Sequence, residues 1–169
     1  MNKTVICHDI EGKEHRVSTN DLRWRPSAYG IVIKDDSILL SPQFNENSYD
    51  LPGGGIDLGE SPEDAVIREV KEETGLDVVN PKAVNISFSF FKLPRASKNE
   101  FVQSIMLYYA CDFTGGKLSS DGFDEYEQQY ARLAEWVPLP KLDSIDVASS
   151  VDWRPFVKQA VTKYANLGH

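Results

Sequence analysis

The chain has 169 residues, of which 41% are apolar and 26% are charged. This composition is typical of a folded globular protein and disfavours a disordered or membrane-embedded chain, and the length predicts one domain over residues 1–169. The formal net charge of −8 argues against binding to long nucleic acids, because their phosphate backbone attracts positively charged surfaces.

The two cysteines, Cys7 and Cys111, are far apart in the sequence and form no disulfide or zinc motif, which favours a reducing cytoplasm. The amino terminus lacks the apolar run of a signal peptide, and no later segment is long enough to cross a bilayer. The negative charge would repel a small anionic substrate unless a bound cation reversed the local potential. We therefore expect a cytoplasmic protein without membrane contact, and a metal site.

The first predicted element is a β-hairpin, in which Thr4–Asp9 and Glu14–Ser18 flank the polar turn Glu11-Gly12-Lys13. We assign residues 1–22 to this amino-terminal extension and residues 23–169 to the core of the domain. The hairpin is interpreted as a sheet edge or as the contact of a homodimer.

Two apolar runs, Tyr29–Lys34 and Ser37–Ser41, predict a second hairpin that belongs to the core. A helix is predicted over Ser61–Thr74, because residues suited to both helix ends are present. Ser61 can cap the first amides, and Gly75 can end the helix in a left-handed conformation.

The second half of the chain is predicted to form strands and then a helix. Aromatic and β-branched residues indicate the strands Ala83–Lys92, Phe101–Phe113 and Arg132–Val137. Apolar residues at helical spacing predict a closing amphipathic helix over Val151–Leu167. Strands, one central helix, more strands and a terminal helix indicate a mixed α/β (α+β) layer fold.

The central helix carries the residues that indicate chemistry. At about 100° per residue, Glu69, Glu72 and Glu73 fall within one arc, and we expect their carboxylates to face one point. All-oxygen ligation by carboxylates suits Mg²⁺ or Mn²⁺, which share their remaining sites with water and substrate phosphate. The alternative for such an acidic run is a solvated helix face.

Three glycines, Gly53, Gly54 and Gly55, precede the helix and allow backbone to approach a ligand or metal closely. The spacing of Gly54, Gly59 and Glu60 superficially matches a Walker loop. Glu60, however, stands where that loop has lysine, and it would repel phosphate. A P-loop nucleotidase is therefore disfavoured.

The complete pattern is Gly54-x5-Glu60-x7-Arg68-Glu69-Val70-x-Glu72-Glu73-x-Gly75-Leu76. It resembles the box of the Nudix (MutT-like) hydrolase family, and every defining position is filled over Leu51–Leu76. The resemblance implies an α-β-α sandwich with a mixed central sheet. It also implies hydrolysis of a diphosphate bond in a nucleoside diphosphate derivative, in which water attacks phosphorus and one to three cations, Mg²⁺ or Mn²⁺, neutralise the anhydride oxygens.

The resemblance also implies roles for single residues. Glu69, Glu72 and Glu73 match metal-binding and catalytic glutamates, and the carbonyl of Gly53 matches a metal ligand. The supporting positions are Gly54, Glu60, Arg68 and Gly75. Physically, Arg68 can orient the carboxylates through an ion pair with Glu60 or Glu72.

The group that activates the water is predicted to be Glu69, with Glu125 or Glu127 from a later loop as alternatives. Substrate contacts are expected outside the box, because an aromatic ring can stack on a base and a cation can meet a phosphate. The candidates are Trp24, Arg25, Phe88, Phe90, Arg95 and Lys98. No further signature selects ADP-ribose, a dinucleoside polyphosphate, coenzyme A or NADH as the substrate.

Two other functions stay open. A Nudix-like regulatory module would bind a nucleotide without cutting it, although the complete set of acids argues against this. An isomerase on the same scaffold would need an acid–base pair, with cysteine the expected participant, and no such pair is visible in the sequence.

Overall fold

The computed structural model describes residues 3–9, 12–43, 47–93, 100–123, 132–148 and 150–164. Within these ranges strands dominate, accompanied by two longer helices and two short 3-10 helices. The elements in chain order are β1 (Thr4–His8), β2 (Glu14–Ser18), η1 (Thr19–Asp21), β3 (Leu22–Lys34), β4 (Ser37–Pro42), β5 (Ser48–Asp50), β6 (Gly53–Gly55), α1 (Pro62–Thr74), β7 (Leu76–Lys92), β8 (Phe101–Gly116), β9 (Glu135–Pro138), η2 (Leu139–Ser144), β10 (Asp146–Val147) and α3 (Arg154–Lys163).

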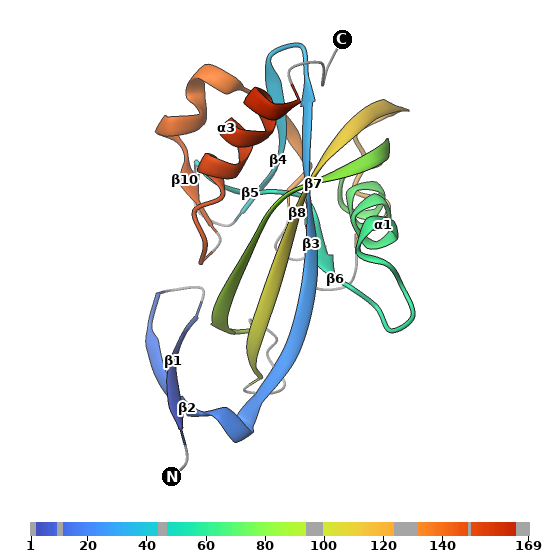
Figure 1. The fold of residues 1–169 in the computed structure, drawn as a ribbon. Helices are drawn as coiled ribbons and strands as arrows, with labels where there is room; N and C mark the ends of the chain where they lie inside the picture. Colours follow the sequence, from blue (N-terminus) through green and yellow to red (C-terminus); the bar gives the residue numbers. More distant parts are fainter. Residues whose placement is uncertain are drawn as a thin grey trace.

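The strands form one mixed sheet in the order β10-β5-β4-β3-β8-β7-β1-β2, with β6 paired to β3 and β9 paired to β4. Strands β3 and β8 are parallel from Leu22↔Phe101 to Val32↔Cys111, whereas β7 and β8 are antiparallel. These three long strands run down the length of the molecule (Figure 1). The mixed central sheet is therefore as predicted.

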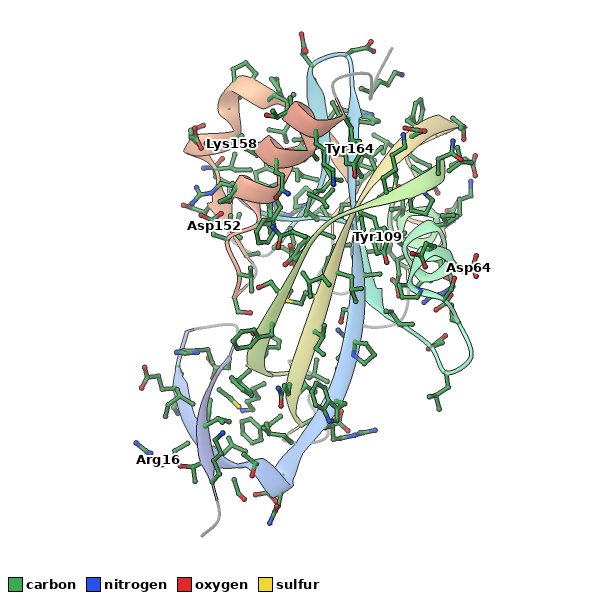
Figure 2. The ribbon with its side chains drawn as sticks, in the orientation of Figure 1. Arg16, Asp64, Tyr109, Asp152, Lys158 and Tyr164 are labelled. Carbon is green, nitrogen blue, oxygen red and sulfur yellow. The ribbon has the colours of Figure 1, made fainter. Side chains whose placement is uncertain are left out.

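Helices α1 and α3 cover opposite faces of the sheet (Figure 1). Because side chains alternate along a strand, β3 serves both layers: Val32 packs with Val66 of α1, and Ile31 packs with Val157 of α3. Tyr109 of β8 lies on the α1 side (Figure 2). The three layers confirm the predicted α-β-α sandwich.

The predicted amino-terminal hairpin is present, since β1 and β2 pair antiparallel from Thr4↔Ser18 to His8↔Glu14. It joins the sheet through the parallel pair His8↔Phe91 of β1 and β7. Below the two helices, β3, β7 and β8 extend toward this hairpin (Figure 1). The homodimer contact stays a prediction.

Several elements differ in length from the sequence-based expectation. Strand β3 begins at Leu22 rather than at Tyr29, because parallel pairing with β8 supplies the hydrogen bonds for its polar first half. Helix α3 covers Arg154–Lys163, with Trp153 at its start. No helix among the described residues is long and apolar enough to cross a membrane.

Candidate active site

Helix α1 begins and ends where its terminal residues predict. The Ser61 Oγ accepts a hydrogen bond from the Asp64 amide at 3.1 Å, and Gly75 ends the helix at a φ of 75° while its amide donates to Lys71. The apolar side, which includes Val66 and Val70, is fully buried against the sheet. Burial of these residues holds the flanking glutamates next to the loop that precedes the helix.

Arg68 forms hydrogen bonds with more partners than the two glutamates, Glu60 and Glu72, that the sequence predicted. Its Nε and Nη2 donate to the two oxygens of Glu60 at 2.8 and 2.9 Å, and its Nη1 donates to Glu69 at 2.8 Å and to Glu72 at 2.9 Å. Nη2 also donates to the carbonyl of Gly55 at 3.0 Å. The predicted orienting role is therefore supported by bonds to both predicted partners and to two further groups.

The contacts between Glu60 and Arg68 shift the pKa values of both groups. The hydrogen bonds from Arg68, followed by one from the backbone amide of Asp57, lower the pKa of Glu60 to about 2. The hydrogen bond to Glu60, followed by those to Glu69 and Glu72, raises the pKa of Arg68, so its guanidinium stays charged at every physiological pH. Glu60 is consequently an ionised partner that fixes Arg68, which leaves Glu69 and Glu72 to share one nitrogen.

Glu69 packs against the glycine strand β6. A Cβ on Gly54 would lie 2.7 Å from the carboxyl carbon and from both carboxyl oxygens of Glu69, which is closer than van der Waals contact allows. The Glu69 side chain is only 12% exposed. Glycine at position 54 therefore provides the space that this carboxylate occupies.

The side chain of Glu73, from helix α1, contacts the other end of strand β6, at Gly53. Its Oε2 accepts hydrogen bonds from the Gly53 amide at 3.1 Å and from the Ser41 hydroxyl at 3.4 Å. Glu72, by contrast, is 47% exposed, and within the described part of the chain it forms an ion pair with Arg68 alone. The glutamates thus have three different environments, although they are neighbours on one helix.

The three carboxylates do not converge on one point, contrary to the geometric expectation. Among the residues that the structure describes, no three His, Cys, Asp or Glu side chains are close enough together to hold a metal ion. Like charges repel, and two of the carboxylates turn to Arg68 while Glu73 turns to a backbone amide. The donor set itself, carboxylates and a glycine carbonyl beside a Cβ-free strand, still fits a hard divalent cation.

The predicted substrate residues are divided between the two faces of the sheet. Register places Trp24 of β3 and Phe90 of β7 on the same face, because both lie opposite Gln103 of β8. Trp24 is 67% exposed. Arg25 lies on the other face, where its Nη1 donates to Ser27 at 2.8 Å.

The face that carries Arg25 also holds two residues that sequence reasoning did not single out. Tyr29 lies beside Gly53, with its ring 2.8 Å from the place of a Cβ there. Burial raises the pKa of Asp50 to about 7, although the Leu51 amide opposes this effect. An acid three residues before the glycine run was the available signal for Asp50.

Four sequence candidates lie outside the described residues, so the structure does not place them relative to the site. They are Arg95, Lys98, Glu125 and Glu127. The two cysteines are both buried. Burial raises the pKa of the Cys111 thiol to about 12, so it is a poor nucleophile.

Comparison with known proteins shows a family and many curated relatives, two of which are described here. The ADP-ribose pyrophosphatase of Methanocaldococcus jannaschii is 37% identical over 116 residues, which are 67% of this chain and 63% of that protein. The NAD-capped RNA hydrolase NudC of Pseudomonas aeruginosa is 31% identical over 126 residues, which are 73% of this chain and 41% of that protein. The chain thus spans less than two thirds of the length of either relative.

The fold has counterparts among solved structures. The MutT protein of Bacillus halodurans aligns with a TM-score of 0.61 and 21% identity over 81% of this chain and 82% of that one. This similarity concerns the fold alone. The model of the NUDIX domain matches residues 24–156, a range that includes strand β6 and the whole of helix α1. The chain therefore belongs to the NUDIX domain family.

Proposed function

We propose that the chain is a divalent-metal-dependent hydrolase that cleaves the phosphoanhydride bond of a nucleoside diphosphate linked to another moiety, with water attacking phosphorus. The observation that carries this proposal is the position of Glu69 and Glu73 against the Cβ-free strand β6. Family membership supports it, as do the two relatives described above, which are named as a pyrophosphatase and a hydrolase.

We assign a separate role in the proposed reaction to Arg68, Glu69 and Glu73. Arg68 holds Glu69 and Glu72 in fixed positions before substrate arrives, which reduces reorganisation during the reaction. Glu69 is the group proposed to accept the proton of the attacking water, because its carboxylate is partly buried at the glycine strand. The Gly53 amide and Ser41 orient Glu73.

The proposed cofactor is Mg²⁺, for which Mn²⁺ can substitute. It would be held by Glu69, Glu72, Glu73 and the carbonyl of Gly53, and when bound it supplies Lewis-acid stabilisation of charge on the phosphate oxygens. We propose ADP-ribose as the first substrate to test, because the M. jannaschii relative is named for it. NAD-linked substrates are the next to test, because the P. aeruginosa relative is named for NAD-capped RNA. That long nucleic acids are not bound stays a prediction.

The test is product formation from ADP-ribose, NADH, nucleotide sugars, dinucleoside polyphosphates and nucleoside triphosphates, each with Mg²⁺, with Mn²⁺ and with chelator. We expect chelator-sensitive cleavage that Glu73→Gln abolishes. Glu14→Gln, at an exposed hairpin residue, is the control and should keep wild-type activity. Full activity in both Glu72→Gln and Glu73→Gln would show that the metal site is wrongly assigned.

A nucleotide-binding regulatory module is the second candidate. It predicts thermal stabilisation by a nucleotide without product release over hours. Silence across the substrate panel together with such stabilisation would favour it. An isomerase stays the least supported function, because both cysteines are buried.

A further inference from the structure

Strand β6 lies between two arginines. On the α1 side, Arg68 donates to the carbonyl of Gly55. On the opposite side, Nη2 of Arg25 would lie 3.5 Å from a Cβ on Gly55, so this guanidinium rests directly on the glycine. The same short strand therefore has a cation on each of its faces.

The two arginines differ in their partners. Arg68 forms ion pairs with three glutamates. Within the described part of the chain, Arg25 forms no ion pair with any acid. It is half-buried in a protein of net charge −8. A shielded guanidinium is costly unless it gains an anionic partner.

Arg25 is nevertheless held in place. Its Nη1 donates to the Ser27 hydroxyl at 2.8 Å, and Ser27 is 3.3 Å from the hydroxyl of Ser104 on the neighbouring strand. The Ser104 hydroxyl in turn donates to the carbonyl of Arg25 at 2.9 Å. The side chain of Arg25 also forms a hydrogen bond with Tyr29. Both partners, Ser27 and Tyr29, are neutral hydroxyl groups, so neither neutralises the charge of Arg25.

The Tyr29 hydroxyl lies next to Arg25, since Arg25 lowers the pKa of Tyr29 against the larger effects of burial and Asp50, which raise it. The Tyr29 ring abuts Gly53, and the amide of Gly53 donates to Glu73. The charges of Asp50 and Glu73 also raise the pKa of Tyr29. Two hydrogen-bond donors, Arg25 and Tyr29, are thus connected through Gly53 to Glu73, one of the proposed catalytic acids.

We propose that Arg25, assisted by the Tyr29 hydroxyl, is the anion-binding residue of a second subsite on the α3 face of β3, which takes the substrate phosphate that water does not attack. The inference rests on the proposed function, because a diphosphate compound brings a second phosphate to this strand. The planar fork of arginine matches two phosphate oxygens, and Ser27 fixes its orientation.

The test measures binding without turnover. Calorimetry with Mg²⁺ and α,β-methylene-ADP-ribose, whose P–C–P bridge water cannot cleave, compares wild type with Arg25→Ala, Arg25→Lys and Arg23→Ala. We expect Arg25→Ala to weaken binding roughly 10- to 100-fold. Arg25→Lys should recover part of this loss, because it keeps the charge but not the fork.

Arg23 provides the matched control, since it has the same charge on the same strand but is 71% exposed and paired with Glu100. Arg23→Ala should bind the probe within about twofold of wild type. Equal binding by wild type and Arg25→Ala would overturn the subsite, as would an equal loss in Arg23→Ala. Thermal melts of Arg25→Lys show whether a loss reflects unfolding.

Kinetics separate this inference from the proposed function. If both hold, Arg25→Ala raises KM for the cleaved substrate and keeps chelator-sensitive turnover. If the wild type cleaves nothing but its binding of the probe depends on Arg25, the subsite stands and the hydrolase fails. If the wild type cleaves substrate and Arg25→Ala is unchanged in binding and in KM, the hydrolase stands and the subsite fails.

Discussion

Arg68 binds both carboxylate oxygens of Glu60, with Nε 2.8 Å from Oε1 and Nη2 2.9 Å from Oε2. Glu60 precedes helix α1, whereas Arg68 lies within it, so this paired contact fastens the loop to the helix. The third nitrogen, Nη1, then reaches Glu69 and Glu72. One side chain thereby fixes the loop and two of the proposed catalytic acids.

Replacing Arg68 tests this arrangement. Arg68→Lys keeps the charge but cannot form the paired contact with Glu60 while also reaching Glu69 and Glu72. We expect kcat/KM to fall at least about 10-fold, since second-sphere partners of metal ligands typically have effects of this size. Lys71→Ala, which removes an exposed cation of the same helix, is the control. Steady-state kinetics that show equal effects of the two variants would contradict the orienting role.

The pKa of Glu60 gives a prediction about stability and pH. A folded-state pKa of about 2, below the ordinary value of 4.5, means that the bond to Arg68 contributes fully above about pH 5 and is lost as pH falls toward 2. Glu60→Gln should therefore be less stable than wild type near pH 7, by about 1 kcal/mol after solvent screening. Urea unfolding between pH 2 and 7 should show that difference shrinking with acid. A difference that does not vary with pH would exclude this explanation.

Gly54→Ala should impair activity more than stability. The added Cβ would meet the carboxyl end of Glu69 at 2.7 Å, and this flexible end can move aside without unfolding the strand. Gly115→Ala, in strand β8, is the matched control, because a Cβ there would have no heavy atom within 4 Å. We expect kcat to fall at least about 10-fold in Gly54→Ala, with both variants close to wild type in thermal melts. Wild-type turnover by Gly54→Ala would show that the position of Glu69 is unimportant.

Metal removal should lower the thermal stability of the wild type. A ligand that binds only the folded state stabilises by about 2.7 kcal/mol when its concentration is 100 times its Kd. Melting curves with Mg²⁺, with Mn²⁺ and with chelator should therefore differ for wild type. The difference should disappear in a Glu72→Gln/Glu73→Gln variant, whose chelator melt is expected to match or exceed that of wild type because like-charge repulsion is reduced. An undiminished Mg²⁺ effect in that variant would place the cation elsewhere.

Asp50 predicts the opposite pH dependence to Glu60. Burial raises its pKa to about 7 from 3.8, so between these pH values the folded state holds a proton that the unfolded state has lost. The contribution of this group to stability consequently falls as pH rises from about 4 to 7. Asp50→Asn keeps the oxygen that accepts from the Leu51 amide and removes this loss. At pH 8 it should exceed wild type by on the order of 2 kcal/mol, with no difference near pH 4.

The control for this variant is Asp146→Asn, at an exposed carboxylate of β10. It changes the net charge equally but should leave the pH profile of unfolding as in wild type. If Asp146→Asn and Asp50→Asn behaved alike across the pH range, total charge rather than burial of Asp50 would be the cause.

The sequence by itself determined the elements whose signals are local. Ser61 and Gly75 set the ends of helix α1, because capping depends on residues adjacent in the chain. The spacing of Arg68 from Glu72 placed them one helical turn apart, and their contact follows. The apolar run Tyr29–Lys34 likewise predicted a core strand, although it did not predict that β3 begins at Leu22.

Only the tertiary structure decided relationships between distant segments. The sequence did not predict that β3 extends back to Leu22, and therefore did not place Trp24 and Arg25 on a strand, where they point to opposite faces; parallel pairing with β8 decides this. Nor does helical spacing show that Glu73 turns to Gly53 while Glu69 turns to Arg68. Helix geometry fixes only the directions in which these side chains leave the backbone, whereas charge repulsion and the strand packed beside the helix decide where each carboxylate comes to rest.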